Sequence, residues 1–250
     1  MSIKINGTTI SGVNLNGSEL MKISLNGTTI YEGIPPYYNE LKNGVTLTES
    51  QWLAFLNGGG IKYIIDKGET STFLRKKVIL TNSADSTYTT WSIGDFNHDN
   101  TNDTCDLILD NSIHNIIFGS SRLYSSSNAR AWLKGTYYNG FSTDIKNKLQ
   151  TMSVVSNGNT LSDKVKLLSV TEVGASFTQA LVEGTKYPIF ASSNIANITR
   201  IRTGANDYWW LRSRYTSGTN YVFLVYTDGS INSVSYSTTS FGLVPCIRFA

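Results

Sequence analysis

The sequence has little charge and no concentration of charge of either sign. Lys, Arg, Asp and Glu together make up 16% of its 250 residues, and the formal net charge at pH 7 is +3. No block of like charges occurs along the chain. Because proteins that bind nucleic acids carry a basic patch or stripe, these absences argue against DNA or RNA. We expect no nucleic acid among the partners.

Long hydrophobic runs and cysteines are also scarce. No stretch approaches the run of about 18 apolar residues that indicates a membrane-spanning helix, and the N-terminus lacks the pattern of a signal peptide. We expect no membrane insertion and no export by the general secretory route. Cys105 and Cys246 are too few for a disulfide framework, and we expect both to be free and buried.

Catalytic motifs are missing as well. Neither His98 nor His114 belongs to an HExxH motif or stands beside a Ser or Cys nucleophile motif, and no glycine-rich loop joins a strand to a helix. Nothing places two carboxylates at the spacing that glycoside hydrolysis needs. We predict that the protein is not an enzyme. We expect no cofactor, unless the acidic loop described below binds calcium.

The first thirty residues contain a repeat with a period of ten. Its units are Ile5 to Ile10, Leu15 to Leu20 and Leu25 to Ile30. Each unit places Asn-Gly between β-prone residues, which is a strong hairpin signal. We predict a small β-meander over residues 1–33 that packs on another chain or on the main domain, because so few residues are seldom stable alone. Pro35 and Pro36 mark a linker, so residues 34–250 form the second domain.

Short helices and short strands are both indicated within residues 34–250. The capping residues Thr48, Ser127 and Ser142 each precede an apolar helical face, which predicts three short helices. Strands are predicted at residues 61–65, 77–80 and 165–170, where β-branched and apolar residues gather. We therefore predict an α+β fold.

Short acidic, amide and hydroxyl side chains alternate between residues 95 and 106. Positions 1, 3, 5, 7, 9 and 12 of a calcium-loop spacing are occupied by Asp95, Asn97, Asp99, Thr101, Asp103 and Asp106. Oxygen atoms at this spacing can surround a hard cation. However, Asn100 stands where such a loop has Gly, and Asp106 is shorter than the usual Glu. Two interpretations remain open: a calcium site, or a loop rich in Asx turns.

The last forty or so residues combine an aromatic block, a polar segment rich in tyrosine and an apolar end. Trp209 and Trp210 are expected in the core, with Arg212 as a structural residue beneath them. Asp228-Gly229 predicts a two-residue type I′ hairpin with Tyr226 opposite Ile231. The composition of the polar segment resembles an antibody paratope. We predict a ligand-binding face formed by Tyr215, Asn220, Tyr221, Tyr226, Asp228, Asn232 and Tyr236; the alternative is an exposed hairpin without a binding role.

These C-terminal residues also carry a family resemblance. The block YWWLRS at 208–213, a hairpin containing Gly, and the end GLVPCIRF at 242–249 are similar to a domain family of gut Firmicutes and their phages, with the pattern WWLRSP…GVRPAL. That family resembles the C-type lectin fold, as do the variable proteins of diversity-generating retroelements. The resemblance covers roughly residues 40–250 and departs from the pattern at Arg214 and at residues 243–246. It implies short helices around twisted antiparallel sheets, with the end strands of the domain paired.

The resemblance, together with the lack of an export signal, implies a phage virion protein made in the bacterial cytoplasm. Residues 1–33 would attach to other virion proteins and form a homo-oligomer. The lectin-like domain would serve adhesion or receptor binding on a bacterial surface glycan or protein, or on a host-associated one. The alternative is a capsid or tail decoration protein with a mainly structural role.

Overall fold

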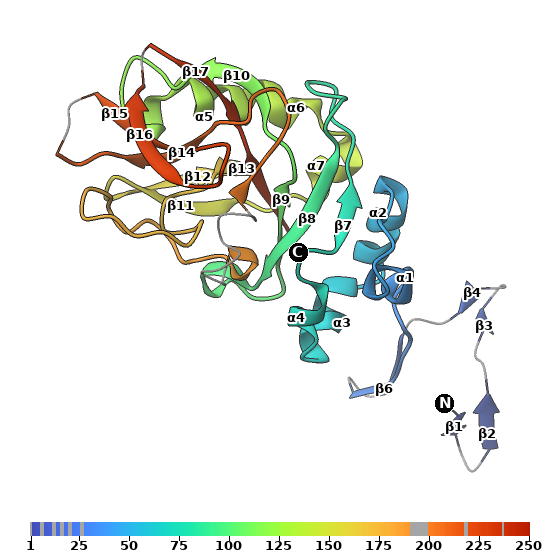
Figure 1. Cartoon of the computed structure of the whole chain (residues 1–250). Helices are drawn as coiled ribbons and strands as arrows, with labels where there is room; N and C mark the ends of the chain where they lie inside the picture. The colour runs from blue at the N-terminus through green and yellow to red at the C-terminus, as the bar shows by residue number, and fades with distance from the viewer. Residues whose placement is uncertain are drawn as a thin grey trace.

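The computed structural model describes residues 2–5, 8–11, 14–15, 18–19, 22–25, 28–190, 200–217, 220–236 and 238–250. It has an α+β fold with few short helices and several sheets, most of them antiparallel (Figure 1). The α+β prediction is thereby confirmed. Among the described residues, no helix has the length and apolar character that crossing a membrane requires.

Two five-stranded sheets form the main body. The C-terminal sheet contains, in spatial order, β10 (Ile113–Ile117), β17 (Ser240–Leu243), β14 (Trp209–Arg214), β15 (Tyr221–Val225) and β16 (Ile231–Ser235). The central sheet contains β13 (Val165–Leu167), β18 (Pro245–Phe249), β9 (Cys105–Leu109), β8 (Thr90–Phe96) and β7 (Lys77–Ile79). All neighbouring strands run antiparallel except β14 and β17, which are parallel.

The apolar C-terminus joins the two sheets. Val244 alone separates β17 from β18, and β18 is buried along its whole length, so the end of the chain is held in place by its neighbours. The predicted pairing of the domain's end strands is wrong, because the domain begins with helices and β18 pairs with β9 and β13. The two ends meet instead through the rings of Trp52 and Phe249, whose centroids are 5.7 Å apart.

Helices cover the N-terminal side and flank the sheets. Their bounds are α1 (Tyr38–Lys42), α2 (Glu49–Asn57), α3 (Gly60–Asp66), α4 (Thr70–Phe73), α5 (Asn128–Trp132), α6 (Tyr138–Gly140) and α7 (Thr143–Lys148). Single turns are η1 (His98–Asn100), η2 (Tyr124–Ser126), η3 (Leu133–Tyr137) and η4 (Pro188–Phe190), and β11 (Met152–Ser156) pairs with β12 (Asn159–Asp163). The predicted N-caps are confirmed, since the Thr48, Ser127 and Ser142 side chains each accept a backbone N–H.

The strand predicted at residues 61–65 is wrong, because this segment is helix α3. Gly59, in the left-handed region at φ +73°, separates α2 from α3. Ile61 and Ile64 are buried three residues apart, as on one face of a helix, and Lys62 forms an (i, i+4) ion pair with Asp66. Burial of a helical stripe outweighs the β preference of the isoleucines. The strand predicted at 77–80 is confirmed for residues 77–79, and that at 165–170 is confirmed for its first three residues.

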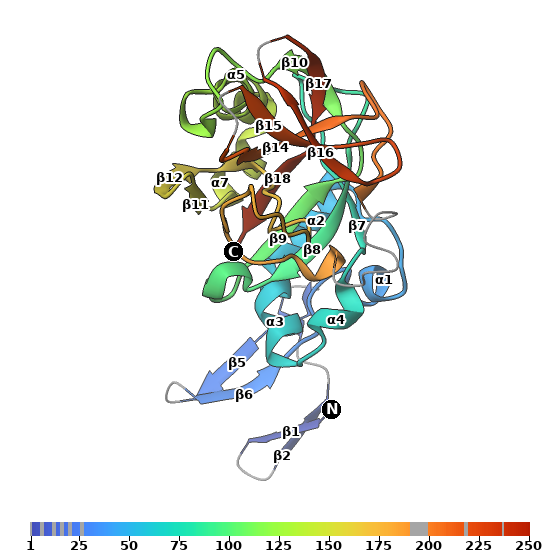
Figure 2. The ribbon, with the colours of Figure 1, turned by 60° about the vertical axis from the view of Figure 1, so that its left-hand side comes forward.

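The N-terminal repeat forms three separate hairpins rather than a continuous meander. Their strands are β1 (Ser2–Ile5) with β2 (Thr8–Ser11), β3 (Asn14–Leu15) with β4 (Ser18–Glu19), and β5 (Lys22–Leu25) with β6 (Thr28–Glu32). Each pair is a two-stranded sheet of its own. Figure 2 labels the strands of the first and third pairs. The Asn-Gly dipeptides that were predicted to form the turns lie outside the described residues.

The hairpin of β15 and β16 forms, but its register differs by one residue from the prediction. Val225, rather than Tyr226, lies opposite Ile231, and Tyr226 N donates to Ser230 O at 2.8 Å. The loop therefore has three residues, 227–229. A type I′ turn needs positive φ at both central residues, whereas in this loop Gly229 alone adopts it, at φ +76°.

The core is aromatic where the sequence predicted it. Trp209 and Trp210 are fully buried, and their indole N–H groups donate to the carbonyl oxygens of Arg200 and Ile116. Cys105 and Cys246 are free and buried, as predicted. Burial raises the pKa of the Cys246 thiol to about 12, so this side chain is an inert part of the core.

Candidate functional site

An aromatic cluster lies on one face of β15, at the outer side of the C-terminal sheet. We call Phe177, Tyr215, Tyr221 and Phe223 the aromatic surface. Tyr221 and Phe223 point to the same face of β15 because side chains alternate along a strand. Phe177 stacks on Phe223 with the ring centroids 5.4 Å apart, and Tyr215 contacts Phe223 at 5.7 Å and Tyr221 at 6.2 Å. Four rings from three segments of the chain thus form one contiguous patch.

The outer rings of this surface are exposed. Tyr221 is 45% exposed and Phe177 is 37% exposed, whereas Phe223 beneath them is 2% exposed. The loop that carries Phe177 adds two more exposed apolar side chains, Leu181 at 38% and Val182 at 82%. Single exposed apolar residues are ordinary on a protein surface, whereas a contiguous patch with exposed rings is a candidate interaction site.

Backbone hydrogen bonds hold the aromatic surface together. Tyr215 N donates to Tyr221 O at 3.0 Å, which closes the connection between β14 and β15. Thr216 N donates to Gln179 O at 2.8 Å, which ties the loop carrying Phe177 to the end of β14. The loop is therefore positioned by main-chain contacts as well as by ring packing.

One end of this loop is anchored by a buried ion network beneath β14. The Glu172 carboxylate accepts from Lys166 Nζ and from Arg212 NH2, each at 2.8 Å, and also from Arg212 NH1. All three side chains are buried. Burial alone would raise the pKa of Glu172, but the charges of Arg212 and Lys166 lower it to about 2. Arg212 is therefore structural, as the sequence indicated.

The other end is anchored by a second buried carboxylate. Glu183 accepts a hydrogen bond from Ser213 Oγ and another from Asn157 N, both at 2.7 Å. Burial raises the pKa of Glu183, opposed by the Arg212 charge. Residues 172–183, which we call the aromatic loop, are thus fixed to β14 at both ends. A loop held in this way presents its exposed side chains in one arrangement.

The seven predicted ligand-binding residues fall into two groups at opposite ends of β15. The first group is Tyr215, Asn220, Tyr221 and Tyr236; the second is Tyr226, Asp228 and Asn232. Along β15, Tyr221 of the first group and Tyr226 of the second are separated by roughly 16 Å. In the second group, Asp228 and Asn232 bind the backbone N–H groups of Ser230 and Ser233, and the Tyr226 ring packs against Tyr208 at 5.2 Å. Only the first group contains residues of the aromatic surface, Tyr215 and Tyr221.

The six predicted calcium ligands lie in and beside the connection from β8 to β9. The Asp95 side chain accepts a hydrogen bond from Phe96 N, and that of Asn97 accepts one from Thr104 N. Asp99 accepts from Thr185 Oγ1, and Thr101 accepts from Arg248 NH1. Asp106 accepts from the Arg248 guanidinium, and Asp103 is exposed. Asp106 is fully buried in its bidentate pair with Arg248, so its charge is already neutralised. These contacts favour the loop rich in Asx turns over the calcium site.

Another set of potential metal ligands comes together instead. In the part of the chain that the structure describes, ligand atoms of His98, Asp99 and Glu172 lie within 4.8 Å of one another. Glu172 is already paired with Lys166 and Arg212, so a cation there would lie beside two buried positive charges. This donor set does not fit a metal ion, and we assign none to it.

The exposed apolar side chains of the aromatic loop were not predicted from the sequence. Phe177, Leu181 and Val182 lie in a stretch with neither helical nor alternating periodicity, so no pattern marked them. The one feature that could have indicated an exposed apolar loop is the pair Leu181-Val182, which stands in a segment without strand or helix character.

Comparison with known proteins places most of the chain in one family. The family model of a domain of unknown function (DUF6273) matches residues 69–249. The matched region includes both five-stranded sheets and the aromatic surface, and leaves the N-terminal hairpins outside. No curated protein and no solved structure matches the chain.

Proposed function

The chain belongs to the DUF6273 family, and we propose that it is a binding protein, not an enzyme, that uses the aromatic surface for adhesion or receptor binding. The observation that carries this proposal is the pair of exposed rings, Tyr221 and Phe177, which are joined through Tyr215 and the buried Phe223. The two anchored ends of the aromatic loop support it, because a pre-organised surface loses little conformational entropy when a ligand binds.

The chemistry around the rings fits a glycan or a protein on a bacterial or host-associated surface. Exposed tyrosine and phenylalanine rings offer flat apolar faces for the C–H face of a sugar or for an apolar side chain. Asn220 is exposed and Ser235, opposite Tyr221, is partly exposed, so both lie ready for hydrogen bonds with hydroxyl or peptide groups. The ligand would lie along β15 and the outer strand β16.

We extend the proposal to the fold and the setting of the protein. A C-type-lectin-like domain is supported by the short helices around antiparallel sheets and by a C-terminal strand that lies inside a sheet, between two neighbours. The C-terminal strand β18 pairs with β9 and β13 rather than with a strand from the start of the domain, which counts against it. The setting would be a phage virion, with residues 1–33 joining other virion proteins and forming a homo-oligomer; the repeated hairpins support this.

A second candidate is a capsid or tail decoration protein. It is favoured by the outer strand β16, which ends the C-terminal sheet and could pair with a neighbouring subunit in a particle. In that case the aromatic surface would be covered by virion protein rather than by a receptor.

Adsorption to bacterial cells separates the two candidates. The fluorescently labelled full chain is compared with a double variant, Phe177→Ser with Tyr221→Ser, and with the control Val45→Ser, which removes another exposed apolar side chain. Receptor binding predicts that the double variant loses at least about tenfold in affinity while its Tm and the control are unchanged. Equal adsorption by all three proteins would overturn the proposal, and failure of the double variant to enter particles would favour decoration.

A further inference from the structure

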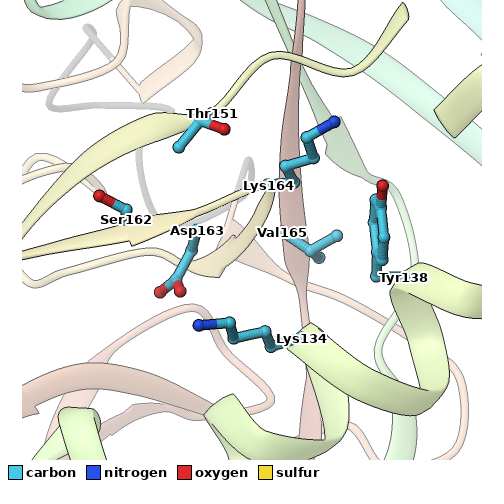
Figure 3. A pocket seen from close by; sticks show the side chains of 7 residues that line it. All are labelled: Lys134, Tyr138, Thr151, Ser162, Asp163, Lys164 and Val165. Atoms are coloured by element: carbon cyan, nitrogen blue, oxygen red, sulfur yellow. The ribbon is translucent and has the colours of Figure 1, made fainter. Parts of the chain in front are cut away.

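A pocket of about 330 Å³ opens between the helical turns η3–α6 and strands β12–β13 (Figure 3). Lys134 and Tyr138 line it from the helical side, and Asp163, Lys164 and Val165 line it from the strands. No residue of the aromatic surface contributes to it. This volume is at the lower end of the range of about 300–1,000 Å³ for small-molecule sites, which suits a single ring rather than a polymer.

The charges of the pocket favour an anion. The Asp163 carboxylate is buried and already paired with Arg130, whose Nε and NH2 donate to it at 2.9 and 2.7 Å. Lys134 is exposed and has neither a hydrogen bond nor an ion pair within the described residues. Lys164 has no carboxylate partner there; its Nζ lies 3.5 Å from Lys146 O and 5.6 Å from the centre of the Tyr138 ring. Two ammonium groups therefore remain without a counter-charge.

The remaining lining favours a ligand that is apolar on one face and hydroxylated on the other. The half-buried ring of Tyr138 and the buried side chain of Val165 form an apolar wall. Thr151 and Ser162 place exposed hydroxyl groups at the opening, and neither hydroxyl bonds to another group in the described part of the chain. In Figure 3 the two lysine side chains lie on either side of Val165.

We propose that this pocket binds an anionic sugar, with one ring against Tyr138 and its carboxylate or phosphate at the ammonium group of Lys134. A sugar supplies an apolar C–H face for the tyrosine, hydroxyl groups for Ser162 and Thr151, and a charged group for Lys134. The inference does not rest on the proposed function, because it uses other residues on other elements.

Titration of the ¹⁵N-labelled full chain tests the proposal. Glucuronate and glucose 6-phosphate are compared with neutral glucose, and with acetate and inorganic phosphate, which carry the charge without the ring. We expect at least one anionic sugar to shift the amide signals of Tyr138 and Ser162 in a saturable manner, while glucose and the simple anions do so at least tenfold more weakly. Whether the carboxylate or the phosphate sugar binds identifies the source of the anion.

Two variants complete the test. Lys134→Gln is expected to weaken the binding of the anionic sugar roughly tenfold, because a charge-assisted hydrogen bond becomes a neutral one. Lys67→Gln, which changes another exposed lysine outside the pocket, is expected to leave it unchanged. The proposal is overturned if no anionic sugar shifts these signals, if both variants weaken binding equally, or if phosphate alone binds as tightly as glucose 6-phosphate.

Discussion

Glu172 anchors the aromatic loop because its buried carboxylate forms ion pairs with two buried cations, Lys166 and Arg212. Glutamine at this position keeps the shape but removes the charge, so both cations lose their partner. Breaking a buried ion pair costs about 3–5 kcal/mol. We predict that Glu172→Gln lowers the free energy of unfolding by about this amount, measured by urea denaturation at pH 7.

Glu183→Gln is the matched control at the other end of the loop. Glu183 accepts from Asn157 N and from Ser213 Oγ, and a glutamine can accept from the first and donate to the hydroxyl of the second. Burial of the Glu183 carboxylate raises its pKa and so already disfavours the ionised form. We expect a change of less than about 1 kcal/mol. If Glu183→Gln loses as much stability as Glu172→Gln, burial of a polar side chain, rather than ion pairing, would explain both losses.

The two glutamates also predict opposite dependences of stability on pH. The pKa of Glu172 falls from 4.5 to about 2 on folding, so its contribution is present above pH 4.5 and is lost as the pH falls towards 2. The pKa of Glu183 is raised, so its contribution is present below pH 4.5 and is lost as the pH rises through the folded value.

We therefore predict that the stability difference between wild type and Glu172→Gln shrinks as the pH falls from 7 to 3, while Glu183→Gln gains relative to wild type as the pH rises. Urea denaturation across this range measures both trends. A difference for Glu172→Gln that is constant from pH 7 to 3 would contradict the lowered pKa.

At the residue scale, the sequence predicted which large side chains are buried but not which charges meet. Trp209, Trp210 and Arg212 stand in one apolar block, so their structural role was predictable. The partners of Glu172 are 6 and 40 residues away, and no spacing rule links a loop glutamate to a strand arginine at that separation. Such pairs are found only once the fold has brought them together.

Among the elements, the hairpin of β15 and β16 shows why a correct turn prediction can give the wrong register. Asp-Gly is compatible with a two-residue type I′ turn and with a three-residue loop that has Gly in the left-handed region. Which of these two loops forms decides the register, so it shifts every side chain of one strand relative to the other. It places Ser235, rather than Tyr236, opposite Tyr221 at the aromatic surface.

Gly229 is the residue that fixes this loop, because its φ of +76° is unfavourable for any residue with a Cβ atom. We predict that Gly229→Ala destabilises the protein by about 1–2 kcal/mol. Gly135→Ala is the matched control, since Gly135 is helical and a Cβ there meets no atom within 4 Å. Thermal denaturation is expected to show no loss for Gly135→Ala; equal losses would contradict the assigned loop.

For the whole molecule, the α+β class was predictable from the mixture of capped helices and short strands, but the order of strands was not. The two sheets are linked by the last ten residues, and the parallel contact of β14 with β17 joins segments about thirty residues apart in sequence. Long-range pairing of this kind depends on the burial of the entire core. The pairing of the domain's end strands was predicted wrongly for the same reason, because it too depends on long-range packing.

The N-terminal hairpins are predicted to contribute little to the stability of the main body. Each hairpin is a two-stranded sheet of its own, and none of its strands belongs to either five-stranded sheet. We predict that deletion of residues 1–33 lowers Tm by less than about 3 °C, corresponding to about 1 kcal/mol. Size-exclusion chromatography of the same protein is expected to show loss of self-association. A fall in Tm of about 10 °C or more would show that the hairpins are part of the main fold.

Hydroxyl-radical footprinting of the full chain, free and bound to host envelope, tests the role of the aromatic surface most directly. Modification of Phe177 and Tyr221 is expected to fall on binding, while modification of the exposed Val45 stays the same. Unchanged modification of Phe177 and Tyr221 in a bound sample, with protection elsewhere on the chain, would contradict the account.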